Sequence, residues 1–227
     1  MRLLLVASDR MEFRGILARA REVRPASLPV DWARFARLAG HDVLLVANGV
    51  GVKRAAAAVD VAAAAFRPEA VVSTGFRGAL DESLAVGEIV VADRIIPDGR
   101  VADLTQPHCR RATVYTIDHV AQTAEEKLRL RATGASAVEM EAAGVASRAA
   151  ALCLPFYCVK AVTDLAGETL ANNYNKALRA DGHFDTIFLL RSALRRPFAR
   201  LPEVIRLRSR CVRAARALGD FFADCRF

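Results

Sequence analysis

Hydrophobic residues along the chain cluster in short uninterrupted runs instead of alternating with polar residues. Such continuous apolar runs are typical of strands that are covered on both faces. The runs that have the length and the β-branched content of strands are residues 3–8, 42–47, 70–75, 88–93, 113–117 and 156–164. We therefore expect these segments to be central strands of a buried sheet.

Helical segments lie between several of these strands, at residues 12–20, 51–66 and 139–152. Strands that alternate with helices predict an α/β fold. The expected architecture is a three-layer α/β/α sandwich with a central mixed, mostly parallel twisted sheet. The short link between the runs at 70–75 and 88–93 is where we expect an antiparallel part of that sheet.

The remaining segments have weaker patterns. Residues 94–111 contain turn residues without a clear period and are predicted to form a surface loop. The polar stretch after Asp164 predicts a loop and a short helix, and residues 201–225 have helical spacing with a proline near the start. We expect a single domain over residues 1–227 that ends in a basic helical extension at about 184–227.

Composition limits the class of protein. The chain has 227 residues, of which 53% are hydrophobic, which excludes disorder, and no apolar run is long enough to span a bilayer. We expect a soluble, cytoplasmic protein. The formal charge is +8, and the segment from Phe184 to Phe227 holds ten arginines against four acids, so it carries +6 of that charge. Either this segment is a closing helix with a solvated arginine face, or it contacts an anionic surface.

Cysteines and histidines do not form a metal-binding pattern. The five cysteines are Cys109, Cys153, Cys158, Cys211 and Cys225. They are odd in number, scattered and without C-x-x-C spacing, which argues against a disulfide framework and against a zinc site. A reducing cytoplasm fits this pattern best. The histidines are far apart in sequence: His41, His108, His119 and His183. We expect neither a metal nor a cofactor.

Small and polar residues gather where the predicted strands end. They are Ser8 with Glu12, residues 48–51, residues 74–78, and Thr163 with Asp164. Ligands of open α/β sheets bind beyond the carboxyl ends of the strands, so we expect these segments to meet in one pocket.

The stretch SAVEMEAAGVAS places Glu139 and Glu141 at the start of a predicted helix. Acidic side chains are favoured at a helix N-terminus, and residues two apart point in different directions. One of the two carboxylates is therefore expected to point into the pocket, where it can bind the vicinal diol of a ribose.

The same stretch, together with VVSTGFRGALDESLAVGEIVVAD, NGVGVKRAAAA and VKAVTDLA, resembles the nucleoside phosphorylase and nucleosidase superfamily. The resemblance is closest to its methylthioadenosine/S-adenosylhomocysteine nucleosidase branch and covers roughly residues 1–170. It implies an enzyme that acts on an adenine nucleoside and forms a homodimer.

The resemblance also implies roles for individual residues. Glu141 would bind the ribose hydroxyls, and Met140 would line the sugar pocket. Asp164 would donate a proton to N7 of the purine, and Glu12 would activate the attacking water. The loop near the nucleophile would consist of Thr74, Gly75, Arg77 and Gly78. Cleavage of an N-glycosidic bond needs an acid at the base and anionic groups near the sugar, and burial in an apolar pocket would keep Asp164 protonated.

Two features of the sequence depart from the family pattern: the residue at position 77 and the composition of the expected base pocket. Arg77 stands where the nucleosidases have a small residue, and its guanidinium suits phosphate, so inorganic phosphate is an alternative co-substrate to water. Glu12 favours water, and the two signals conflict. Arg10 and Arg14 are either part of a phosphate site or exposed to solvent. The base pocket is assigned to Val120, Ala121 and Thr163, where no stacking aromatic residue is evident.

The C-terminal segment resembles the tail of the hopanoid-associated phosphorylases, which remove adenine from adenosylhopane. That resemblance implies a lipid-linked substrate and a place in hopanoid biosynthesis. The basic charge of the segment, together with its apolar residues, independently suits a peripheral contact with the anionic inner face of the membrane. The alternative function is a soluble 5′-methylthioadenosine/S-adenosylhomocysteine nucleosidase. A further alternative is a basic nucleic-acid-binding protein on an inactive fold, which the absence of a recognised reading motif disfavours.

Overall fold

The computed structural model describes residues 1–97, 99–104, 109–225 and 227. Part of the predicted loop, together with His108 and Arg226, lies outside the described residues. The described strands form a nine-stranded sheet with these bounds: β1 (Arg2–Ala7), β2 (Arg21–Pro25), β3 (Trp32–Leu38), β4 (His41–Ala47), β5 (Ala70–Ala79), β6 (Ile89–Ile96), β7 (Arg110–Thr116), β8 (Ala137–Glu139) and β9 (Phe156–Asp164).

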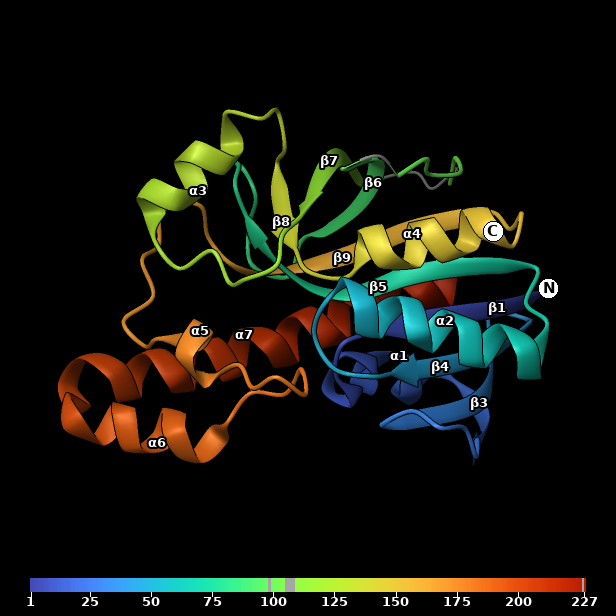
Figure 1. Ribbon diagram of the computed structural model, residues 1–227, viewed down its shortest axis with the longest axis horizontal. Helices are drawn as coiled ribbons and strands as arrows, with labels where there is room; N and C mark the ends of the chain where they lie inside the picture. The colour runs from blue at the N-terminus through green and yellow to red at the C-terminus, as the bar shows by residue number, and fades with distance from the viewer. Residues whose placement is uncertain (98, 105–108, 226) are drawn as a thin grey trace.

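The described helices surround this sheet (Figure 1). Their bounds are α1 (Arg14–Arg19), α2 (Val52–Phe66), α3 (Ala124–Arg131), α4 (Ala142–Ala151), α5 (Tyr174–Ala177), α6 (Thr186–Arg195) and α7 (Pro197–Asp224), and a 3₁₀ turn, η1 (Arg10–Phe13), precedes α1. Each of the six predicted strands corresponds to an observed strand, although the ends differ. The predicted helices at 12–20, 51–66 and 201–225 correspond to η1 with α1, to α2 and to α7.

The sheet is not the simple twisted layer that the sequence predicts. Its strand order is β2-β3-β4-β1-β5-β8-β7-β6-β9, and β9 also pairs with β5, so the second half of the sheet closes into a barrel. Four of its strand pairs are antiparallel: β2 with β3, β3 with β4, β5 with β8, and β6 with β9. The expected mixed sheet is present, but the expected open three-layer sandwich is wrong for this half.

The barrel closes because β5 is longer than its apolar run. The strand continues past Gly75 to Ala79, where Gly78 and Ala79 pair with β8 while residues 71–78 pair with β9. A register shift between Arg77 and Gly78, and another in β6 between Ala92 and Arg94, interrupt the regular pairing. Such bulges bend a strand and increase its twist, which helps a sheet to curl onto itself.

Two apolar clusters cover the two faces of the open half of the sheet. Val59 of α2 and Val145 of α4 pack in one cluster with Leu4 and Val6 of β1. Ile16 of α1 and the α7 residues Leu218 and Phe222 pack in the other cluster with Leu3 and Leu5. The alternation along β1 therefore divides its side chains between the two helical layers.

Helix α7 packs very closely on α1. A β-carbon added at Gly15 would lie 1.8 Å from the carbonyl oxygen of Ala215, and one added at Gly219 would lie 2.2 Å from the carbonyl oxygen of Gly15. The inner half of α7 thus belongs to the core. Its outer half pairs with α6 in a helical hairpin that projects from the body of the molecule (Figure 1).

No helix among the described residues is long and apolar enough to cross a bilayer.

Candidate active site

A cavity of about 560 Å³ lies where the ends of several strands meet the C-terminal helices. Five carboxylates from three distant segments of the chain line its wall: Asp9, Glu12, Glu139, Glu141 and Asp164. Met140, Arg77, Gly78, Val120, Ala121 and Thr163 also line it, whereas Thr74 and Gly75 are absent from the described lining. The fold thus brings most of the residues singled out in the sequence to one place.

Glu12 is held on η1 by main-chain donors. Its Oε2 accepts from the amides of Ser8 at 2.8 Å and Asp9 at 3.1 Å, and its Oε1 accepts from the amide of Phe76 at 2.7 Å. Burial raises the pKa of this carboxyl group, and the charge of Lys160 and these N–H donors offset the rise only in part. A raised pKa suits a general base that works near neutral pH.

Gly75 makes room for that carboxyl group. A β-carbon at this position would lie 2.5 Å from Glu12 Oε1, and the backbone φ of +119° is itself one that side-chain-bearing residues rarely adopt. Gly75 therefore leaves space for the Glu12 carboxylate and is not part of the described cavity lining.

Glu139 and Glu141 share the buried cation Lys160. Lys160 Nζ lies 2.9 Å from Glu139 Oε2 and 3.6 Å from Glu141 Oε2, and both its side chain and that of Glu139 are buried. Burial alone would lower the pKa of Lys160, but the two glutamates outweigh it and raise that pKa. Burial alone would raise the pKa of Glu139, yet Lys160 and Thr116 hold it below its usual range.

The difference between the two glutamates comes from their positions. Glu139 ends β8 and does not begin a helix as predicted; its Oε2 accepts from the amides of Glu141 at 2.9 Å and Ala142 at 2.8 Å, so it anchors the start of α4. Glu141 precedes α4, and its Oε1 accepts from the amide of Gly51 at 3.2 Å. Burial, together with the neighbouring carboxylates, raises the pKa of Glu141 to about 8.

Asp164, at the end of β9, is paired with Lys127 of α3. Lys127 Nζ donates to Asp164 Oδ2 at 2.5 Å and to the carbonyl oxygen of Leu165 at 2.7 Å, and the lysine side chain is fully buried. The expectation that apolar surroundings would keep Asp164 protonated did not include this contact with a buried ammonium group. Gly78 lies beneath the pair, since a β-carbon there would approach Asp164 Oδ2 to 2.9 Å.

Arg77 is buried, and no described residue forms a hydrogen bond with its guanidinium group. Among the described residues, its three guanidinium nitrogens and the hydroxyls of Ser73 and Thr74 make no hydrogen bond. Burial lowers the pKa of Arg77, and Cys158 and Glu88 are the groups that most oppose this effect. Arg10 and Arg14 are exposed.

The expected base pocket lies between the barrel and α5. Asn175 of α5 accepts from the amide of Val120 at 2.7 Å and donates to its carbonyl oxygen at 2.9 Å, which fixes the loop. Beside it, His119 Nδ1 lies 2.7 Å from Asp118 and Nε2 lies 2.6 Å from Glu126. The hydrogen bond with Asp118 is the main reason that the pKa of His119 is raised.

The C-terminal segment forms the other side of the cavity. Its apolar residues there are Phe184, Leu189, Leu207 and Cys211, and Tyr174 of α5 lines the same cavity. The amide of Val50 donates to the carbonyl oxygen of Gly182 at 2.8 Å, so this segment is fastened to the loop that also contacts Glu141. The basic extension is thus part of the cavity and not an appendage beyond it.

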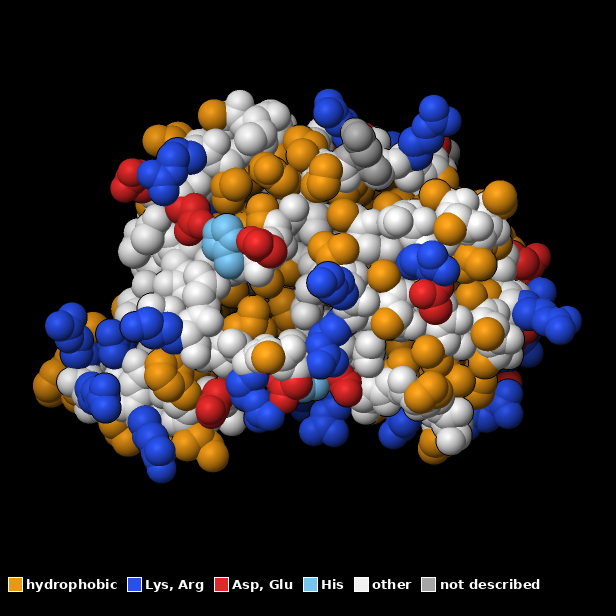
Figure 2. Space-filling model, in the orientation of Figure 1, with side chains coloured by type: hydrophobic (Ala, Val, Ile, Leu, Met, Phe, Trp, Pro, Cys, Tyr) orange, Lys and Arg blue, Asp and Glu red, His pale blue; other side chains and the backbone are white. Residues whose placement is uncertain are grey.

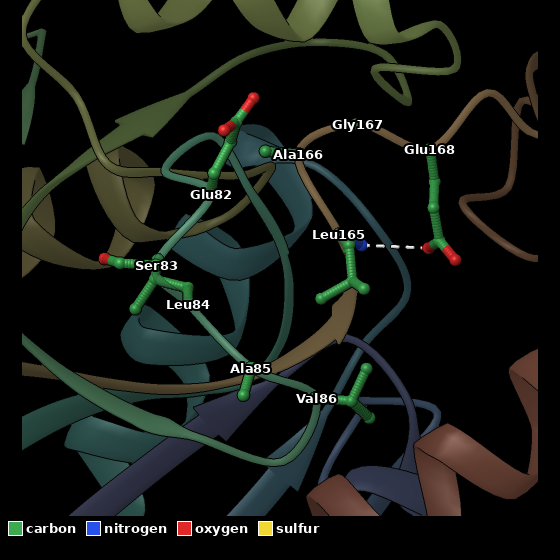
Figure 3. Close-up of a pocket in the computed structure, with 9 residues that line it drawn as sticks. All are labelled: Glu82, Ser83, Leu84, Ala85, Val86, Leu165, Ala166, Gly167 and Glu168. Atoms are coloured by element: carbon green, nitrogen blue, oxygen red, sulfur yellow. Dashed lines mark hydrogen bonds between the residues drawn. The ribbon is translucent and has the colours of Figure 1, made fainter.

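A second hollow, of about 480 Å³, lies between residues 82–86 and residues 165–168 (Figure 3). Its wall is largely apolar. The carboxylate of Glu168 has protein partners: it accepts from the amide of Leu165 at 3.0 Å and forms an ion pair with Arg210 at 2.6 Å. The hollow lacks converging catalytic groups in the described part of the chain, so the larger cavity is the candidate active site.

Lys127, Lys160 and His119 are the residues of the site that the sequence analysis missed. A lysine within the apolar run FYCVKAVTD was an available signal for Lys160, since an unpaired lysine is rarely buried in a strand. Lys127 lies in the polar stretch TAEEKLRLR, where nothing distinguishes it from a surface residue. The described residues contain no group of three or more side chains suited to hold a metal ion.

Comparison with known proteins identifies the family. The model of the Phosphorylase superfamily matches residues 31–119 and 107–181. A 5′-methylthioadenosine/S-adenosylhomocysteine nucleosidase of Marinomonas sp. (strain MWYL1) is 26% identical over 178 residues, which are 63% of this chain and 77% of that protein. The corresponding protein of Listeria welshimeri is 25% identical over 176 residues, or 61% of this chain and 76% of that protein.

Solved structures share the fold. The S-adenosylhomocysteine nucleosidase of Streptococcus pyogenes, in complex with 5-methylthiotubericidin, has a TM-score of 0.70 at 20% identity and covers 99% of this chain and 97% of its own. The 5′-methylthioadenosine/S-adenosylhomocysteine nucleosidase of Neisseria meningitidis, in complex with methylthio-immucillin-A, has a TM-score of 0.69 at 18% identity and covers 98% of both chains. With a family model that matches most of its length and a fold shared with these nucleosidases, the chain belongs to the phosphorylase superfamily.

Proposed function

We propose that this enzyme cleaves the N-glycosidic bond of a 5′-substituted adenosine and releases adenine. The observation that carries the proposal is the convergence of Glu12, Glu141 and Asp164 on one cavity. The relatives, which are methylthioadenosine/S-adenosylhomocysteine nucleosidases, support the same substrate class.

Glu12 is proposed as the base that activates water. Its carboxylate is fixed by three main-chain donors, so it needs little reorganisation before it accepts a proton. The water oxygen bonds to the anomeric carbon as its proton passes to Glu12, while the electrons of the glycosidic bond leave with the adenine.

The departing base needs a proton at N7, and the Lys127–Asp164 pair is proposed to supply it. Asp164 reaches the cavity, whereas Lys127 is buried behind it and contacts Oδ2. Asp164 passes a proton to N7 while the ammonium group of Lys127, which contacts Oδ2, supplies Asp164 with another, so the pair ends as a carboxylate and a neutral amine. Lys127 is thus a positioning residue, which acts through Asp164.

Glu141 is proposed to bind the ribose hydroxyls. Gly51 and Lys160 hold its two oxygens from the protein side, and the ribose side faces the cavity. Met140 lines the same wall.

Water is favoured over phosphate as the attacking group, because the carboxylate of Glu12 would repel a phosphate anion in the same cavity. Arg77 is the observation that favours phosphate. Its buried guanidinium group has no hydrogen-bond partner among the described residues, and an anion would supply one. The experiment must therefore distinguish hydrolysis from phosphorolysis.

A second candidate substrate is adenosylhopane. The apolar side of the cavity, formed by residues such as Phe184, Leu189 and Leu207, supports a bulky hydrophobic 5′ group. The curated relatives favour the smaller methylthioadenosine and S-adenosylhomocysteine.

The test follows adenine release from methylthioadenosine, S-adenosylhomocysteine and adenosylhopane, each with and without inorganic phosphate. We expect adenine and a free 5′-substituted ribose in phosphate-free buffer. A requirement for phosphate, with a 5-substituted ribose 1-phosphate as product, would assign the reaction to phosphorolysis. Release from none of the three, combined with salt-dependent binding of DNA, would instead favour a nucleic-acid-binding protein on an inactive fold.

A further inference from the structure

The outer face of the C-terminal hairpin carries exposed apolar side chains at helical spacing. Ile187, Leu190 and Leu194 of α6 are 63%, 56% and 61% exposed, and Phe198, where α7 begins, is 96% exposed. Residues three, four and seven apart lie on one side of a helix. These four residues are called the hairpin ridge below.

Basic side chains flank the hairpin ridge, and the acid nearest to it in sequence, Asp185, caps the start of α6, where it accepts from the amide of Phe188 at 2.8 Å. Arg191, Arg195 and Arg196 are exposed, and in the described structure none of them forms an ion pair. The span from Thr186 to Gly219 contains nine arginines and one acid, Glu203. That acid is buried and accepts from the amide of Asn172 at 3.0 Å, so it does not offset the surface charge.

The opposite face of the same hairpin lines the candidate active site. Leu189 of α6 and Leu207 of α7 belong to the cavity wall. Leu189 is about 160° around the helix from Ile187. If another surface covered the hairpin ridge, only the helices of the hairpin would therefore separate that surface from the cavity. Figure 2 shows basic and hydrophobic side chains intermixed at the projecting end of the molecule.

Charge decides which partner fits. A second copy in a symmetric dimer would place the same arginines opposite each other, which is repulsive. Nucleic acid would pair with the arginines but would leave three exposed aliphatic side chains without a partner, and base stacking would have only Phe198 to use. An anionic bilayer satisfies both features, because its headgroups attract arginine and its acyl boundary takes up Leu, Ile and Phe.

We propose that the hairpin ridge, with Arg191, Arg195 and Arg196, is a docking surface for an anionic lipid bilayer. The protein then lies on the membrane by α6 and the start of α7, with its cavity facing away from the headgroups across the hairpin. This contact requires neither substrate nor catalysis, so it is independent of the proposed function.

The test is sedimentation of the full chain with vesicles of phosphatidylglycerol and, separately, of phosphatidylcholine. We expect binding to the anionic vesicles that weakens as salt rises, and little binding to the neutral ones. The double variants Leu194→Ser/Phe198→Ser and Arg191→Gln/Arg195→Gln should each bind about tenfold more weakly or worse.

Matched controls remove the same residue types elsewhere. Leu128→Ser removes a side chain that is 70% exposed on α3, and Arg2→Gln/Arg21→Gln removes two exposed arginines. Both controls should bind as the parent does. All of these positions are exposed, and circular dichroism and adenine release in solution should be unchanged for Leu194→Ser/Phe198→Ser.

Three outcomes would overturn the inference. The first is equal vesicle binding by the parent and the two hairpin variants. The second is failure of the parent to bind anionic vesicles at low salt. The third is a dimer in sedimentation velocity that Leu194→Ser/Phe198→Ser abolishes, which would assign the ridge to a second copy. Inactivity of the enzyme toward nucleosides would leave each of these readouts intact.

Discussion

Charged residues of the candidate active site and of the C-terminal hairpin differ in what surrounds them. In the site, Lys127 and Lys160 are fully buried and each contacts a carboxylate. In the hairpin, Arg191, Arg195 and Arg196 are exposed, and the structure as described gives them no ion-pair partner. A buried pair must be geometrically complete, because an unpaired buried charge is costly, whereas exposed charges remain hydrated and are available to a partner.

The comparison separates two uses of the same kind of side chain. The buried lysines orient the catalytic and ribose-binding carboxylates, so their effect is on geometry and on pKa. The exposed arginines create a positive surface, so their effect is on association and depends on salt. Substitutions in the two regions should therefore change different measurements.

The largest expected effect comes from Asp164→Asn. The amide keeps the shape of the side chain but removes the acid, so kcat for adenine release should fall by about 10²- to 10⁴-fold. The control is Asp60→Asn, which removes an exposed carboxylate paired with Arg148 and should leave kcat unchanged. Near-normal turnover by Asp164→Asn would show that protonation at N7 comes from another group.

The next effect concerns stability and contrasts a buried pair with an exposed one. Lys160→Met leaves Glu139 and Glu141 buried without their cation, so the free energy of unfolding should fall by about 3–5 kcal/mol. Arg148→Met breaks the exposed pair with Asp60 and should cost less than about 1 kcal/mol. Urea unfolding at neutral pH measures both. Equal losses for the two variants would contradict the distinction between buried and exposed charges.

A smaller effect should appear in the pH dependence of catalysis. Burial raises the pKa of Glu12 above 4.5, and only its ionised form can accept a proton from water, so kcat/KM should rise with pH through that raised pKa. Glu12→Gln should lower kcat/KM by about 10²-fold and remove this limb of the profile. Glu69→Gln, at an exposed position, should leave the profile unaltered. A limb that persists in Glu12→Gln would mean that another group titrates.

Local patterns in the sequence were sufficient for the elements that are uniformly apolar. The runs at 3–8, 42–47 and 156–164 correspond to β1, β4 and β9 because each is buried along its length. The strand β2 was missed because all of its residues are exposed, so no apolar run marks it. The strand β8 was missed because only three residues form it, and its last residue, Glu139, was assigned to the following helix.

Barrel closure could not be predicted from local patterns, because it depends on which strands pair. The apolar run that predicts β5 ends at Gly75, yet pairing of Gly78 and Ala79 with β8, added to the pairing of β5 with β9, is what closes the barrel. The site shows the same limit. Family motifs indicated Glu12, Glu141 and Asp164, whereas the lysines that hold two of these carboxylates come from a polar helix and from the middle of a strand.

The single long helix α7 has a consequence for how far the chain can be shortened. Its outer end forms the hairpin, while Leu218 and Phe222 near its other end are buried beneath β1 and α1. A protein cut before α7 would expose that layer of the interior and would lose the support beneath the segment that carries Glu12. The basic tail is therefore a structural wall of the molecule, and its removal would take away part of the core together with part of the cavity.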